Sequence, residues 1–262
     1  MQKKTLVPLL CAAFAGLADA AVVTKTVAYE IDGEAFEGVL VYDDSVTTAR
    51  PGLLAVPSWM GVNQDTVAKA ARAAGDKYVV FVADMYGKSI RPSNAEEAGA
   101  AAGAVRADRA LMRKRAQAAV EVLKAQSSEV ALDVSKLGAI GFCFGGGTVL
   151  ELARSGAPLK GFVSFHGNLD TPNPADAKNI KAPILVLHGA DDPAVPQEQV
   201  DGFIAEMKAA KTDWQLVSYG GAVHSFTNPK ANVPGRNEYH PVVAARAFKA
   251  MNDLFDEVFA EQ

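Results

Sequence analysis

The stretch 137-LGAIGFCFGGG-147 decides the fold of this chain. Its first half is apolar and predicts a buried strand, and the residues from 145 to 153 predict a helix packed closely against that strand. Cys143 lies between them at the centre of a G-x-C-x-G frame, where a sharp turn from strand to helix requires small flanking residues. Unpaired N–H groups at a helix N-terminus favour an anion, so the frame predicts a reactive thiol; a small buried hydrophobe is the alternative.

Segments on both sides of this frame alternate between strands and helices. An antiparallel N-terminal hairpin is predicted from residues 26–31 and 36–42, and further strands at 52–56, 78–83, 159–165, 184–187 and 214–218. Helices are predicted at 65–74, 198–211 and 241–260. Another helix, from the capping-box pattern at Ser93 to about Gln126, should break near Gly99 or Gly103. We therefore expect an α/β fold with a mostly parallel central sheet and helices on both faces.

The length and composition are those of an ordinary globular protein. The 262 residues are 49% hydrophobic and 21% charged, without an internal repeat or a low-complexity linker. We expect one domain over residues 21–262, acting as a monomer. The formal charge of −4, which becomes −5 without residues 1–20, argues against a nucleic-acid partner. Because no P-loop or dinucleotide fingerprint occurs, we predict no cofactor.

The first twenty residues match a secretory signal. Lys3-Lys4 precedes an apolar run from Leu6 to Leu17, and Ala18-Asp19-Ala20 supplies the small residues of a cleavage site. We predict cleavage after Ala20 and export as a periplasmic or secreted protein; an uncleaved anchor is the alternative. The run is too short for a permanent span, so we expect no stable membrane insertion. Cleavage would remove Cys11 and leave one cysteine, which cannot form an intramolecular disulfide.

An acid and a histidine follow Cys143 in the order that a nucleophile–acid–histidine triad takes in this kind of fold. Asp191 and Asp192 lie in a turn after the predicted strand 184–187. We choose Asp192 because the Pro-x-Val-Pro segment after it stiffens the loop, and we expect Asp191 to form the turn. His224 follows the last predicted strand; an idle loop histidine is the alternative. The spacing of His166 and His188 fits no metal-ligand signature, so we predict no metal.

Several further blocks make a resemblance specific. They are Trp59-Met60-Gly61-Val62-Asn63, Asp84-Met85-Tyr86-Gly87, Phe165-His166-Gly167 and His224-Ser225-Phe226. With the elbow at Cys143 and the turn at Asp192, they make the chain resemble the dienelactone hydrolase family of α/β-hydrolases from about Gly52 to Phe226.

This resemblance implies an α/β-hydrolase fold and cofactor-free hydrolysis of small esters or lactones through an acyl-thioester. It implies that Cys143 is the nucleophile, that His224 is a base and then an acid, and that Asp192 orients His224. The backbone N–H groups of Trp59 and Phe144 would form the oxyanion hole. Tyr86, with Trp59, Met60 and Phe144, would line an apolar pocket.

The chain departs from the family at the expected substrate-binding positions. Ser58 stands where relatives acting on dienelactone have a glutamate that helps to activate the thiol. Lys88 and Asn228 stand where those relatives have two arginines for the substrate carboxylate, and Arg91 is near enough in sequence to compensate. These departures argue against dienelactone as the substrate. Ser58 and Asn228 leave a binding protein without catalysis as one alternative. A lone thiolate outside the cytoplasm can be oxidised, which leaves a thiol redox protein as another.

Overall fold

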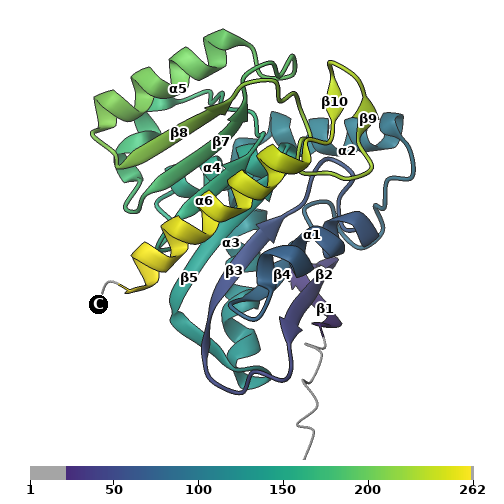
Figure 1. Cartoon of the computed structure of the whole chain (residues 1–262). Helices are drawn as coiled ribbons and strands as arrows, with labels where there is room; N and C mark the ends of the chain where they lie inside the picture. Colours follow the sequence, from purple (N-terminus) through teal and green to yellow (C-terminus); the bar gives the residue numbers. More distant parts are fainter. Residues whose placement is uncertain (1–21, 261–262) are drawn as a thin grey trace, which may run out of the picture.

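A single eight-stranded sheet runs through the computed structural model, which describes residues 22–260; the predicted signal peptide lies outside the described residues (Figure 1). From edge to edge the strands are β1 (Val22–Ile31), β2 (Glu34–Asp43), β4 (Val79–Val82), β3 (Arg50–Val56), β5 (Leu132–Phe142), β6 (Phe162–Phe165), β7 (Ile184–Gly189) and β8 (Trp214–Tyr219). Strand β2 pairs antiparallel with β1 and β4, and the remaining pairs are parallel. The predicted fold class is confirmed: a mostly parallel sheet with an antiparallel N-terminal hairpin.

Helices cover both faces of the sheet (Figure 1). One face carries α1 (Gln64–Ala74) and α6 (Pro241–Ala260), and the other carries α2 (Ala95–Ala107), α3 (Arg109–Ala125), α4 (Phe144–Arg154) and α5 (Gln197–Ala210). Alternate residues of β3 enter the two cores: Leu53 packs with α1 and α6, and Leu54 packs with the helices of the opposite face. Burial on both faces explains why the strands read as continuous apolar runs.

The break in the long helical region was predicted at the wrong residue. Helix α2 ends at Ala107 and α3 begins at Arg109, so the break is at Asp108, not at Gly99 or Gly103. The Asp108 carboxylate caps α3 by accepting a hydrogen bond from the N–H of Leu111. An N-cap side chain pairs with an otherwise unpaired N–H and so fixes where a helix starts. A glycine inside a helix costs some stability but does not by itself end the helix.

Two further local features differ from the sequence-based expectation. The cap of α2 is Asn94 instead of Ser93: its side chain accepts from the N–H of Glu97, whose carboxylate in turn accepts from the N–H of Ser93. A small hairpin of β9 (Asn232–Val233) and β10 (Asn237–Glu238) was not predicted, because two-residue strands carry no readable alternation. The structure also has two short 3₁₀ helices, Gln126–Ser128 and Pro174–Asn179.

The turn from β5 into α4 explains the glycines that flank Cys143. A Cβ atom on Gly141 would lie 2.0 Å from the carbonyl oxygen of Gly145, and one on Gly145 would lie 2.1 Å from that of Val56. Cys143 itself has a φ of 56°, a conformation that non-glycine residues adopt only under constraint. The close contact of β5, α4 and β3 therefore holds the thiol at the N-terminus of α4.

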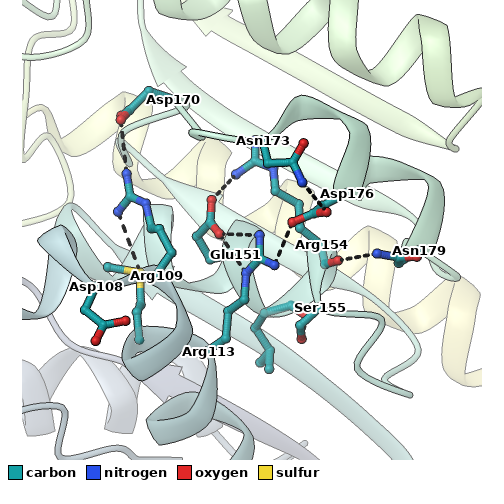
Figure 2. A network of polar contacts seen from close by, with 12 residues as sticks. Asp108, Arg109, Arg113, Glu151, Arg154, Ser155, Asp170, Asn173, Asp176 and Asn179 are labelled. Carbon is teal, nitrogen blue, oxygen red and sulfur yellow. Dashed lines mark hydrogen bonds and ion pairs between the residues drawn. The ribbon is translucent and has the colours of Figure 1, made fainter.

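A network of buried and partly buried charges ties the far end of α4 to its neighbours, and Figure 2 shows the part around Arg113, Glu151 and Arg154. Arg154, whose side chain is 1% exposed, forms two hydrogen bonds of 2.8 Å to the carboxylate of Glu206 on α5 and one of 3.1 Å to Glu151. Arg113 on α3 joins Glu151 to Asp176. Helices α3, α4 and α5 are thus fixed to one another beneath the turn that carries Cys143.

Candidate active site

Three predicted residues lie in contact beyond the C-terminal ends of parallel strands, where open α/β sheets bind ligands. Cys143 follows β5, Asp192 follows β7 and His224 follows β8. His224 Nε2 is 3.0 Å from Cys143 Sγ, and His224 Nδ1 is 2.8 Å from Asp192 Oδ2. Residues that are far apart in sequence therefore form one hydrogen-bonded chain of acid, imidazole and thiol.

The two aspartates of the turn have different partners. Asp192 is buried, and its second oxygen accepts a hydrogen bond of 2.8 Å from the N–H of Ala194, which fixes the carboxylate toward His224. Asp191 is exposed and accepts a hydrogen bond from the N–H of Gly221. Asp192 therefore contacts the imidazole, and Asp191 links two loops.

The charges of the site favour a thiolate beside an imidazolium. Burial alone would raise the pKa of the Cys143 thiol, but the hydrogen bond from His224, its charge and the N–H groups of Phe144 and Trp59 lower it. Burial alone would lower the pKa of His224, but hydrogen bonds with Asp192 and Cys143, together with their negative charges, raise it to about 10. Each of the two groups therefore stabilises the charged form of the other.

The loop after β3 brings a second N–H group to the sulfur. The backbone N–H groups of Trp59 and Phe144 both act on Cys143 and lower the pKa of its thiol. Tyr86 supports this loop: its hydroxyl donates a 2.8 Å hydrogen bond to the Trp59 carbonyl, and its ring packs 5.8 Å from that of Phe144. Two N–H donors beside a nucleophile can also stabilise an oxyanion that forms on an attacked carbonyl group.

A pocket of about 710 Å³ opens over the thiol. It contains Ser58, Trp59, Cys143, His224 and Asn228 from the predicted set. The pocket is large enough for a small organic substrate, since ligand pockets typically measure about 300–1,000 Å³.

Three predicted substrate-binding residues, Tyr86, Lys88 and Arg91, do not line this pocket, and neither does Phe144. Lys88 forms an exposed ion pair with Glu37, and the guanidinium of Arg91 binds the buried Asp84 carboxylate and the Gly87 carbonyl. Lys88 lines a separate pocket of about 590 Å³ between α2, α3 and the loop after β4, to which Tyr86 also contributes. The family resemblance predicted that Lys88 and Arg91 bind the substrate. In the structure, the carboxylates of Glu37 and Asp84 bind these two cations outside the pocket.

Sequence reasoning missed two contributors to the site, and it considered a third, His166, only as a metal ligand. Lys69 of α1 lines the pocket although it lies on the buried side of its helix. The β9–β10 hairpin forms one wall, and the N–H of Glu238 donates to the His224 carbonyl. His166 is buried with its ring 5.2 Å from that of His224, and its Nε2 is 2.8 Å from Thr227 Oγ1. The spacing along α1 carried a signal for Lys69. It lies three residues after Thr66 and directly before Ala70, and both of these belong to the buried face of the helix.

His166 supports the site as a neutral ring. Burial lowers the pKa of His166 well below its ordinary value, and the positive charges of His224 and Lys69 lower it further.

Among residues 22–260, no group of three or more His, Cys, Asp or Glu side chains could hold a metal ion. None of the helices in that range is long and apolar enough to cross a membrane.

Fold and site together define an α/β-hydrolase with a cysteine at the elbow. The profile of the dienelactone hydrolase family matches residues 36–259. The solved structure titled m3DLH is 38% identical, covers 91% of this chain and 99% of its own, and has a TM-score of 0.85. A "Dienelactone Hydrolase-like Promiscuous Phospotriesterase P91 from Metagenomic Libraries" has the same identity and coverage and a TM-score of 0.83.

A curated relative of Bradyrhizobium sp, "Probable 2-oxo-3-(5-oxofuran-2-ylidene)propanoate lactonase", is 28% identical over 78% of this chain and 82% of its own length. The chain belongs to the dienelactone hydrolase family and is a hydrolase that acts on ester bonds, as the resemblance had implied.

Proposed function

We propose that the protein hydrolyses small carboxylic esters or lactones through an acyl-thioester on Cys143. The observation that carries this proposal is the hydrogen-bonded chain from Asp192 through His224 to the sulfur, with distances of 2.8 and 3.0 Å. A buried acid fixes the imidazole, and the imidazole contacts a thiol whose pKa is lowered. A binding protein would not need this arrangement, and family membership favours hydrolysis over a redox role.

In the first half of the proposed reaction, the Cys143 thiolate attacks the carbonyl carbon and forms a tetrahedral intermediate. The N–H groups of Trp59 and Phe144 donate to its oxyanion. His224 then gives its proton to the leaving alkoxide as the C–O bond breaks, which leaves the acyl group on sulfur and the imidazole neutral. With a lactone, the leaving alkoxide stays attached to the acyl group.

In the second half, neutral His224 takes a proton from a water molecule while the water oxygen attacks the thioester carbonyl. The C–S bond breaks, the carboxylic acid leaves, and thiolate and imidazolium are restored. Asp192 holds the Nδ1 proton throughout, so that Nε2 faces the reacting atoms. Ser58 offers a hydroxyl in place of a carboxylate, so His224 is the proton acceptor that this scheme uses.

The substrate class can be tested with a panel of compounds. An activated aryl ester, a five-membered lactone, a thioester and a phosphotriester should be offered to the purified protein, the last because a relative is named for that activity. We expect turnover of the ester and the lactone. Absence of turnover with every carboxylic substrate would contradict the proposal.

Replacing each of the two neighbouring aspartates by asparagine should affect kcat/KM very differently. Asp192→Asn should lower kcat/KM for an aryl ester by about 10²–10⁴-fold, because an amide cannot stabilise the imidazolium or hold its tautomer. The matched variant Asp191→Asn removes an equal charge one residue away, on an exposed side chain that contacts the Gly221 N–H. Its kcat/KM should stay within about twofold of the wild type. Similar losses in both variants would count against Asp192 as the orienting acid.

We also propose that the chain is exported and acts as a monomer in which residues 21–262 form the mature domain. The basic and apolar pattern of residues 3–20 supports export. N-terminal sequencing of protein recovered from the periplasmic fraction should begin at Ala21. Size-exclusion chromatography with light scattering should give a single-chain mass.

A further inference from the structure

Lys69 is a buried cation that faces the candidate active site. Its side chain lines the pocket above Cys143, and the residue is only 9% exposed. Its ammonium nitrogen lies 5.6 Å from the centre of the Phe142 ring, which immediately precedes the nucleophile. Within residues 22–260, no carboxylate pairs with it and no hydrogen bond involves its Nζ. A buried ammonium without a counter-charge costs free energy. An anion in the site, either the thiolate or a bound substrate, must therefore compensate its charge.

We propose that Lys69 is a positioning residue whose ammonium group stabilises the Cys143 thiolate, in a site where Ser58 offers no carboxylate. This inference rests on the proposed function, because it assigns a counter-ion to the same nucleophile. In the thiolate–imidazolium pair, His224 supplies one positive charge at hydrogen-bond distance and Lys69 supplies a second from the opposite element, α1. The ammonium group would then stabilise the thiolate before it attacks the substrate, and again when the C–S bond of the thioester breaks.

The distribution of charge around the pocket supports this role. Apart from Cys143 and His224 themselves, the charged residues among the described lining of the pocket are all basic: Lys69, Lys230 and Arg236. Lys230 is exposed and paired with Asp65, and Arg236 is exposed on the β9–β10 hairpin. Of these three residues, only Lys69 is buried. Its ammonium group and the Cys143 thiolate line the same pocket.

The titratable groups that face this pair come from five elements. They are Asp65 on α1, Tyr86 after β4, His166 after β6, Asp192 and His188 around β7, and His224 after β8. Burial lowers the pKa of Lys69, and the negative charge of Cys143 is the largest influence that raises it again. Asp65 acts on Lys69 more weakly and is already bound by Lys230. The thiolate is therefore the principal counter-charge of Lys69.

The test is the pH dependence of iodoacetamide alkylation, followed on the Cys143 peptide by mass spectrometry of the full chain. Lys69→Met keeps the apolar stem in the core and removes the charge. We expect the midpoint of the alkylation profile to rise by about one pH unit, so that the rate at pH 6 falls about tenfold while the rates converge above pH 9. Lys69→Arg keeps the charge and should restore most of the wild-type profile.

Arg72→Met is the matched control. Arg72 is a cation on the same helix, 4.3 Å from the ring of Phe248, but it is exposed and does not line the pocket. Its removal should leave the alkylation midpoint unchanged. Circular dichroism spectra and Tm values of all variants show whether the fold is retained.

Three results would overturn the inference. One is an unchanged alkylation midpoint in folded Lys69→Met; a second is an equal loss of rate at every pH in both Lys69 variants, which is the mark of a structural role. A third is a raised KM for anionic esters with an unchanged thiol titration, which would assign Lys69 to the substrate. The proposed function fails separately, if ester hydrolysis survives Cys143→Ala, because alkylation does not require turnover.

Discussion

Replacing Cys143 by alanine should abolish ester hydrolysis while the protein stays folded. We expect kcat for an activated aryl ester to fall by about 10⁴-fold or more, since the covalent route is lost and only the oxyanion donors and the pocket remain. Alanine occupies the φ of 56° at the same cost as cysteine, and it adds no atoms to the turn. The fold of the variant should therefore match the wild type in circular dichroism and differ little in Tm.

Chemical modification gives an independent control for this variant. Wild-type protein alkylated by iodoacetamide at Cys143 should lose activity in proportion to the modified fraction, and a substrate analogue that fills the pocket should slow both processes together. Turnover that is undiminished in Cys143→Ala, or in fully alkylated wild type, would exclude Cys143 as the nucleophile.

Replacing Arg154 by methionine should have the largest effect on stability. The change leaves Glu206, whose side chain is 2% exposed, as a buried carboxylate without its cation, while Glu151 keeps Arg113. Breaking a buried pair in this way costs about 3–5 kcal/mol in the free energy of unfolding. Urea denaturation at pH 7 measures the loss, and adding Glu206→Gln to Arg154→Met should recover part of it because the uncompensated charge is removed.

Arg106→Met is the matched control for Arg154→Met. Arg106 also pairs with a carboxylate, Asp170, but both side chains are more than a third exposed. Water screens this pair, so its loss should change the free energy of unfolding by less than about 1 kcal/mol. Equal effects of the two substitutions would show that burial of the network around α4 contributes nothing to stability.

The elbow, the mostly parallel sheet and its antiparallel N-terminal hairpin could be predicted because local patterns in the sequence dictate them. Gly141 and Gly145 lie where a Cβ atom would collide with the backbone. The turn therefore requires glycine at both positions, and the G-x-C-x-G frame predicts the turn. Asp192 and His224 were placed by their position after strands, since the C-terminal ends of parallel strands meet at one edge. Which aspartate faces the imidazole followed from the stiffness of the loop.

Long-range electrostatics could not be predicted in the same way. Lys88 and Arg91 are held away from the pocket by Glu37 and Asp84, partners that no local pattern in the sequence identifies. Lys69 enters the pocket because its ammonium group lies over the ring of Phe142, a contact that depends on the tertiary fold. The β9–β10 hairpin depends on four paired residues and gives no periodic signal.

The most direct measurement is to trap the acyl group during turnover. Wild-type protein mixed with an activated aryl ester should be quenched in acid within the first turnover and digested for mass spectrometry. We predict that the Cys143 peptide carries the acyl mass, that the adduct decays when the substrate is exhausted, and that His224→Ala accumulates little of it. An acyl group on another residue, or steady turnover with an unmodified Cys143 at every quench time, would contradict the acyl-thioester mechanism.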